Sequence, residues 1–141
     1  MTVRILIITD RLESTPELLE AVRTRAKDEV TFRLLVTNPA KAEFHLVHAE
    51  RHDAVEKAQH ALHQFLTELT QAAGHEVRGE VSIRHDAFEA VEEDVFVRPA
   101  DEVLVAVHER ALRQRLHLDL PHRLDTLHLP VSVIPDGLVS S

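Results

Sequence analysis

The stretch Val3-Arg4-Ile5-Leu6-Ile7-Ile8-Thr9-Asp10 decides the fold of this chain. Its continuous run of aliphatic residues predicts a strand that is buried on both faces, because a strand covered on one side only would alternate apolar and polar residues. The strand ends at Thr9-Asp10. Strands of this kind belong to parallel sheets covered by helices, so we expect the rest of the chain to alternate between helix and strand.

Four further apolar segments predict strands of the same type. They span residues 30–36, 77–83, 103–107 and 130–135. Because short right-handed crossovers connect parallel strands, the pattern predicts a doubly wound three-layer α/β/α sandwich with a five-stranded parallel sheet. No linker or repeat interrupts it, so we expect residues 1–141 to form a single domain.

Helical periodicity separates the first three strands. Ser14-Thr15-Pro16-Glu17 predicts a helix start, with either hydroxyl as cap, proline in the first turn and an acid at the positive end of the helix dipole. The apolar side of this helix is formed by Leu18, Leu19, Val22 and Ala26. A long helix should start between Glu43 and Asp53 and run to about Ala73, with Gly74 as its stop. Its apolar stripe is formed by Val55, Ala58, Leu62, Phe65 and Leu69.

The second half of the chain predicts three shorter helices. Asp86 is placed to cap the first of them, and Pro99 ends it. The apolar side of that helix is formed by Phe88, Val91 and Val95. Two short helical stretches are expected at residues 111–116 and 120–127. The acidic run Glu92-Glu93-Asp94 is interpreted as an exposed helix face.

Composition excludes several functions. The 141 residues include 16 Lys and Arg against 24 Asp and Glu, a formal net charge of -8, which argues against a nucleic-acid binder and against docking on anionic lipid. The chain has no cysteine, which excludes a disulfide scaffold, a thiol nucleophile and a thiolate zinc site. The run Ile5-Leu6-Ile7-Ile8 is too short for a signal or membrane segment. We expect a cytoplasmic protein with no membrane contact.

Several motifs together point to a known family. They are the first strand ending in Asp10, Val81-Ser82-Ile83-Arg84-His85-Asp86 before a helix, Ala100-Asp101-Glu102-Val103-Leu104-Val105, and the terminal Leu129-Pro130-Val131-Ser132-Val133. With these motifs, the chain resembles the universal stress protein family over nearly its whole length. It looks most similar to a bacterial subgroup without an established activity, which carries the motifs seen here as Asp101-Glu102 and Asp119-Leu120-Pro121-His122-Arg123.

This resemblance implies a sheet of order 3-2-1-4-5 and a homodimer formed through the last strand, Val131-Ser132-Val133-Ile134. Many members of the family bind ATP with a glycine-rich loop after the fourth strand, whose backbone approaches the phosphates. Here that region, residues 108–119, contains no glycine, and Glu109 and Asp119 would repel phosphate. The glycine of the family's Gly-Asp helix start is replaced by His85. The phosphate-binding residues therefore do not carry over, and we expect no cofactor.

Five residues are candidates for ligand binding at the crevice where the strand order reverses. Asp10 ends the first strand and matches a base- or ribose-contacting position of nucleotide-binding members; it is also suited to capping a turn. Asn38 follows the second strand. His108, Arg110 and Arg113 follow the fourth, where arginine could bind an anion, or could simply form a solvated helix face neutralised by Glu109 and Asp119. The alternative function is thus an ATP- or AMP-binding module that uses Asp10 and the arginines of residues 110–115.

The eleven histidines raise the question of a metal site. On a helix, His45, His48 and His52 would share a face, with Glu56 one turn later, and imidazoles so spaced can bind zinc, nickel or copper. A surface or partly buried position is the simpler interpretation, and we expect no metal. A pH-sensing role is a further option, because histidine titrates near neutrality.

No catalytic set stands out in the sequence, and no Gly-x-Ser-x-Gly elbow is present. The leading hypothesis is a universal stress protein-like, non-enzymatic homodimer that acts in stress adaptation by binding a protein partner or a small ligand. An ATP- or AMP-binding module is the second hypothesis, and an enzyme of the wider adenine-nucleotide-binding superfamily is the third.

Overall fold

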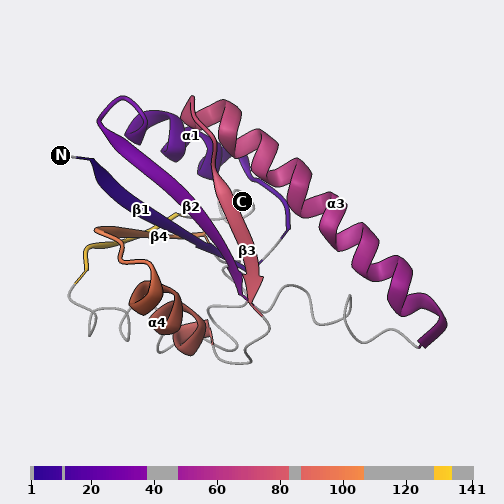
Figure 1. Cartoon of the computed structure of the whole chain (residues 1–141). Helices are drawn as coiled ribbons and strands as arrows, with labels where there is room; N and C mark the ends of the chain where they lie inside the picture. The colour runs from indigo at the N-terminus through magenta and orange to yellow at the C-terminus, as the bar shows by residue number, and fades with distance from the viewer. Residues whose placement is uncertain (1, 11, 38–47, 83–86, 107–128, 135–141) are drawn as a thin grey trace, which may run out of the picture.

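The computed structural model describes residues 2–10, 12–37, 48–82, 87–106 and 129–134, apart from the side chains of residues 48–55, 58, 82 and 87–89. Strands and helices alternate from β1 to β4 in this part of the chain (Figure 1). Their bounds are β1 (Val3–Thr9), α1 (Pro16–Arg25), β2 (Val30–Thr37), α3 (His48–Ala73), β3 (Arg78–Ser82), α4 (Ala87–Val97), β4 (Glu102–Ala106) and β5 (Val131–Val133).

The five strands form one parallel sheet of order β3-β2-β1-β4-β5, as the sequence and the family resemblance predicted. β1 lies in the middle, with Thr9 opposite Val36 of β2 and Ala106 of β4. The observed strand bounds differ from the predicted ones by one or two residues. Residues 83, 107 and 135, which the predictions placed in strands, lie outside the described residues.

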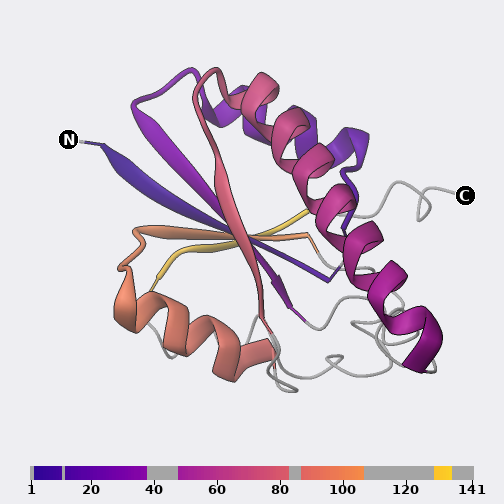
Figure 2. The same cartoon turned by 45° about the vertical axis from the view of Figure 1, so that its right-hand side comes forward.

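Helices cover both faces of the sheet, with α1 and α3 on one side and α4 on the other (Figure 2). Ile5 and Ile7 of β1 pack in the core on the α1 and α3 side, together with Leu18, Phe65 and Leu69 of those helices. Leu6 and Ile8 pack on the opposite side, with Ala90 and Val91 of α4. This double coverage explains the continuous apolar run of the first strand and confirms the three-layer prediction.

Helix α1 begins as predicted. Thr15 is the N-cap, and its Oγ1 accepts a hydrogen bond of 3.2 Å from the backbone N–H of Leu18. Pro16 occupies the first turn, where its missing N–H costs nothing. Ser14, the other candidate for the cap, donates instead to Oε2 of Glu68 on α3, at 3.0 Å. The cap position thus belongs to Thr15, and Ser14 ties the start of α1 to α3.

Helix α3 begins at His48, within the predicted interval, and it ends at a left-handed Gly74 with φ of 79°. Phe65 and Leu69 of the predicted stripe are buried, and Leu62 packs beside them. Thr70 closes the turn into β3, because its carbonyl accepts from the N–H of Gly74 at 2.9 Å and its Oγ1 accepts from the N–H of Val77 at 3.0 Å.

One sequence interpretation is wrong. Glu92 and Glu93 of α4 are exposed, but the side chain of Asp94 is only 8% exposed and forms an ion pair with Arg33 of β2. The run of acids does not lie on one exposed face, because Asp94 turns toward the sheet, where a cation compensates its charge. The predicted cap at Asp86 and the helices at residues 111–116 and 120–127 lie outside the described residues. In the described part of the chain, no helix is long and apolar enough to cross a membrane.

Candidate functional site

The carboxyl ends of β1 and β4 form the place where the strand order reverses, and this is where doubly wound sheets bind ligands. Among the described residues, the two buried polar side chains both lie at this edge of the sheet. They are Thr9 at the end of β1 and Thr37 at the end of β2. Neither threonine was among the candidate residues predicted from the sequence, although a threonine at the end of each of two neighbouring apolar strands was a visible signal.

These two threonines connect three neighbouring strand ends. Oγ1 of Thr37 donates to the carbonyl of Thr9 at 3.4 Å, and Oγ1 of Thr9 donates to the carbonyl of Ala106 at 3.0 Å. Buried hydroxyls need such partners, because an unpaired buried polar group costs about 1–3 kcal/mol. The hydrogen bonds therefore fix the positions of the ends of β2, β1 and β4 relative to one another.

Asp10 comes directly after Thr9 in the chain, and it is half-buried. Its position at the end of β1 lies at the reversal of strand order, as predicted. A carboxylate held there is suited to accept hydrogen bonds from a hydroxyl or an amine of a ligand. Asn38, His108, Arg110 and Arg113 lie outside the described residues, so the predicted grouping of these residues around Asp10 stays a prediction.

The opposite, amino-terminal edge of the same strands is held by ion pairs. Arg4 of β1 contacts Asp101 through its backbone N–H at 2.8 Å and its Nε at 3.1 Å. Arg25 of α1 contacts Glu102 of β4 through two nitrogens, at 2.5 and 2.9 Å. The hydrogen bond from Arg25 lowers the pKa of Glu102, and those from Arg4 lower the pKa of Asp101. The Asp101-Glu102 motif therefore anchors β4 to β1 and α1.

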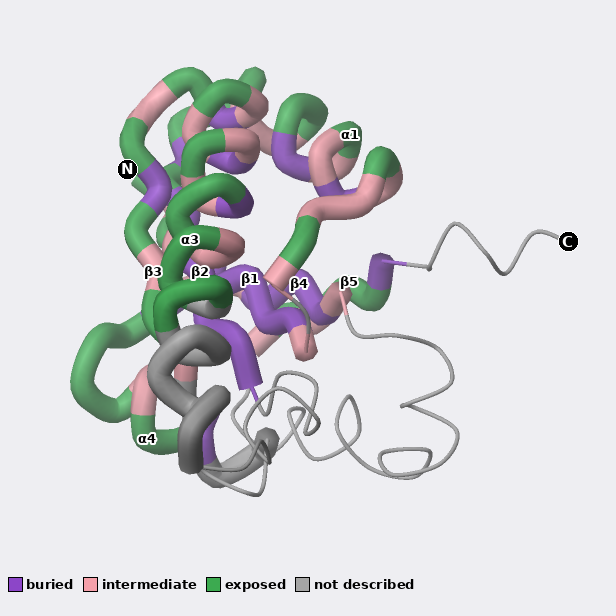
Figure 3. Tube along the Cα trace, turned by 90° about the vertical axis from the view of Figure 1, so that its right-hand side faces the viewer, coloured by how far each residue is buried: buried purple, intermediate pink, exposed green. Residues whose placement is uncertain are grey.

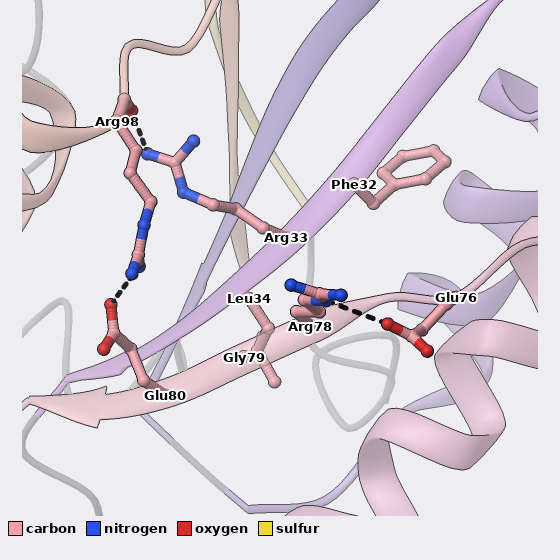
Figure 4. Close-up of a pocket in the computed structure, with 8 residues that line it drawn as sticks. All are labelled: Phe32, Arg33, Leu34, Glu76, Arg78, Gly79, Glu80 and Arg98. Atoms are coloured by element: carbon pink, nitrogen blue, oxygen red, sulfur yellow. Dashed lines mark hydrogen bonds and ion pairs between the residues drawn. The ribbon is translucent and has the colours of Figure 1, made fainter.

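A second polar region lines a hollow of about 450 Å³ beside β2 and β3 (Figure 4). Each of its three arginines is paired. Arg98 contacts Glu80 at 2.9 Å, and Arg78 contacts Glu76 at 2.8 Å. Arg33 contacts Asp94 at 2.6 Å and also donates to the carbonyl of Arg98. Because carboxylates compensate all three guanidinium groups, the hollow has little positive charge to offer an anion.

Metal binding was a weaker alternative in the sequence. In the described ranges, no group of three or more histidine, aspartate or glutamate side chains could hold a metal ion. This finding does not reach the proposed histidine trio, because His45 lies outside the described residues and the side chains of His48 and His52 on α3 are not described. The interpretation of the trio stays a prediction.

No known family profile matches this chain. No curated protein matches it either. Solved structures do match it over almost its whole length. A universal stress protein from Archaeoglobus fulgidus has a TM-score of 0.52 at 12% identity, over 94% of this chain and 93% of that one. A protein of the universal stress protein family from Burkholderia pseudomallei has a TM-score of 0.57 at 16% identity, over 92% and 96%. A third structure, described as a hypothetical protein, has a TM-score of 0.56 at 15% identity, over 95% and 96%.

Proposed function

We propose that this chain, which has the fold of universal stress proteins, works as a non-enzymatic cytoplasmic homodimer of the stress response that binds a protein partner or a small ligand. Fold alone does not assign a function, so the proposal depends on a feature of this chain's own surface. That feature is the edge strand β5.

β5 is the last strand of the sheet, and no described strand pairs with its outer edge. The N–H of Ile134 donates to Val105 at 2.8 Å and the carbonyl of Pro130 accepts from Val103 at 2.9 Å, so these alternate residues face β4. The backbone groups of Val131 and Val133 then point away from the sheet. Val133 is also 46% exposed, which is high for a large apolar side chain. Such an edge favours association, and a two-fold pairing with a second copy would satisfy it and close the assembly.

Two observations support a function without glycine-loop ATP binding. The segment between β4 and β5 has no glycine from residue 108 to 119, so its backbone lacks the feature that allows close approach to phosphates. At the strand ends, the hydroxyls of Thr9 and Thr37 donate to main-chain carbonyls, so their hydrogens are already used and are not offered to a phosphate. One observation favours the second candidate, a nucleotide-binding module, namely the half-buried position of Asp10 where the strand order reverses.

Light scattering at micromolar concentration tests the dimer. We expect a mass twice the 16.0 kDa of one chain for the wild type. Val133→Pro removes an outward-facing N–H and should yield monomer, whereas Val133→Thr keeps the N–H and the branched side chain and should stay dimeric. A monomeric wild type contradicts the proposal, and a dimeric Val133→Pro variant places the interface elsewhere.

Calorimetry with ATP and AMP separates the two candidate functions. The proposal expects no dissociation constant below about 100 µM, which corresponds to roughly -5.5 kcal/mol. Micromolar binding that is lost in Asp10→Asn would favour the nucleotide-binding module instead.

A further inference from the structure

Strand β3 forms the end of the sheet opposite β5, and its outer edge faces no other strand of the described residues. The described residues of β3 are exposed or partly buried, whereas the central strand β1 is buried from Ile5 to Thr9 (Figure 3). The edge of an end strand presents backbone N–H and C=O groups that a further strand can bind. The side chains of β3 therefore decide which strand can pair with it.

The side chains of β3 alternate between the two faces of the sheet. A Cβ at Gly79 would lie 2.9 Å from Cδ2 of Leu66 on α3, so this position faces the side of the sheet that α1 and α3 cover. Val81 packs in the core on the same side. Arg78 and Glu80 alternate with these residues and therefore face the α4 side. β3 thus presents one positive and one negative charge on one face, at alternate positions.

Both charges are accessible to a partner. Nε of Arg78 lies 2.8 Å from Oε1 of Glu76, and Nη1 of Arg98 lies 2.9 Å from Oε1 of Glu80 (Figure 4). Each of these four side chains is 54% exposed or more. Ion pairs with this exposure are weak, because water screens them, so Arg78 and Glu80 can also contact charges on another chain.

A second copy of β3 fits these charges. A two-fold axis perpendicular to the sheet pairs two copies in antiparallel fashion and keeps equivalent faces on the same side. With this axis at Gly79, Arg78 of each copy lies opposite Glu80 of the other. On the other face, Val77 of each copy lies opposite Val81 of the other. Opposite charges on one face and apolar side chains on the other are favourable cross-strand pairs.

Other registers of the same symmetry are unfavourable. An axis at Arg78 would place two arginines opposite each other, and an axis at Glu80 would do the same with two glutamates, which is destabilising. Charged residues usually protect an end strand, because a second copy meets like charges. The order Arg78-Gly79-Glu80 instead admits a second copy in one register.

We infer that β3 is a surface for self-association, at which two copies of this chain pair in antiparallel fashion across a two-fold axis at Gly79. Exposed charge pairs are weak and the formal net charge of -8 per chain opposes association, so this contact should form well above micromolar concentration. β3 and β5 lie at opposite ends of the sheet. The β3 contact is therefore compatible with pairing through β5, and together the two would join copies into a linear assembly.

Sedimentation velocity at low salt, over protein concentrations from micromolar to near millimolar, tests this inference. The mass of the wild type should rise with concentration. Arg78→Glu places like charges opposite each other at both charge pairs, and so does Glu80→Arg, so each variant should associate at least about tenfold more weakly. An equimolar mixture of the two should associate again, because each negative side chain then meets a positive one. Arg23→Glu, the same charge change at an exposed arginine of α1, should associate like the wild type.

The double variant Arg78→Glu, Glu80→Arg keeps opposite charges in both pairs and should also associate like the wild type. Melting curves check the folding of each variant, and the double variant decides the test if a single variant does not fold.

A wild-type mass that stays constant over the series overturns the inference. An equal rise in Arg78→Glu and Glu80→Arg would come from another surface and would also overturn it. Failure of the folded mixture, or of the double variant, to associate would contradict the register at Gly79 and with it the inference. These outcomes do not depend on the β5 dimer, which sets only the mass from which the rise begins.

Discussion

Asp94 on α4 and Arg33 on β2 form a largely buried ion pair, with 2.6 Å between Oδ2 of the carboxylate and Nη2 of the guanidinium group. Their side chains are 8% and 20% exposed. The pair joins α4 to the sheet, and Arg33 also donates to the carbonyl of Arg98 just after that helix. It thus stabilises the layer on the α4 side of the sheet.

Removing the carboxylate should leave Arg33 buried without its counter-charge. We expect Asp94→Ala to lower the free energy of unfolding by about 3 kcal/mol. Glu92→Ala, two residues before Asp94 and on the exposed side of α4, should change it by less than about 0.5 kcal/mol. Urea unfolding of both variants measures the difference. Equal effects would mean that the ion pair contributes nothing beyond surface charge.

Two glycines should respond differently to alanine. A Cβ at Gly79 would lie 2.9 Å from Cβ of Leu34 and from Cδ2 of Leu66, so the β3 backbone packs directly against its neighbours. We expect Gly79→Ala to cost about 2 kcal/mol through overpacking. At Gly74 there is space but φ is 79°, so Gly74→Ala should cost about 1 kcal/mol through backbone strain. Thermal or urea unfolding ranks the two, and a harmless Gly79→Ala would contradict the packing argument.

His75 should be replaceable with a gain in stability. Its ring stacks on Phe32 with 5.8 Å between ring centroids, and Nδ1 lies 3.1 Å from the carbonyl of Glu76. Its buried Nε2 has no partner among the residues that the structure describes. His75→Phe keeps the stacking and removes the unpaired nitrogen, so we expect the free energy of unfolding to rise by about 1 kcal/mol. His75→Ala should lower it, because the stacking is lost. A loss of stability in both variants would contradict this prediction.

The ion pair of Arg25 and Glu102 should make the free energy of unfolding depend on pH in the acidic range. In the folded protein, the hydrogen bond from Arg25 holds the pKa of Glu102 below its ordinary value of 4.5. As the pH falls, Glu102 therefore takes up a proton in the unfolded chain before it does so in the folded protein. The contribution of the pair to the free energy of unfolding is fully present above pH 4.5 and decreases as the pH falls through the lowered pKa.

Glu102→Gln should flatten this part of the profile. The free energy of unfolding, measured with urea at pH 7, 4.5 and 3.5, should differ most between variant and wild type at pH 7 and least at pH 3.5. Asp101 also has a lowered pKa, so some dependence on pH should remain in the variant. Parallel profiles for the two proteins would contradict the assignment to Glu102.

The sequence by itself determined the strands and helices of the described residues and the parallel pairing of the strands, while the strand order was implied by the family resemblance. The apolar run of β1 requires cover on both faces, and Ile5 with Leu6 enter the two separate cores as that pattern predicted. Thr15, Pro16 and Gly74 mark helix ends through local hydrogen bonds and backbone conformation, which depend only on near neighbours. The position of Asp10 followed from the same reasoning, because every parallel strand ends at the same edge of its sheet.

Only the tertiary structure decided which charges meet. Arg33 and Asp94 are 61 residues apart, and Ser14 and Glu68 are 54 apart, so no local pattern joins them. A run such as Glu92-Glu93-Asp94 reads as one solvated face until the helix is placed on the sheet, where the 100° turn between successive residues directs Asp94 inward and leaves Glu92 exposed. That the buried Oε1 of Glu17 has no hydrogen-bond partner among the described residues emerged in the same way, because the partners of a side chain are brought to it by other elements.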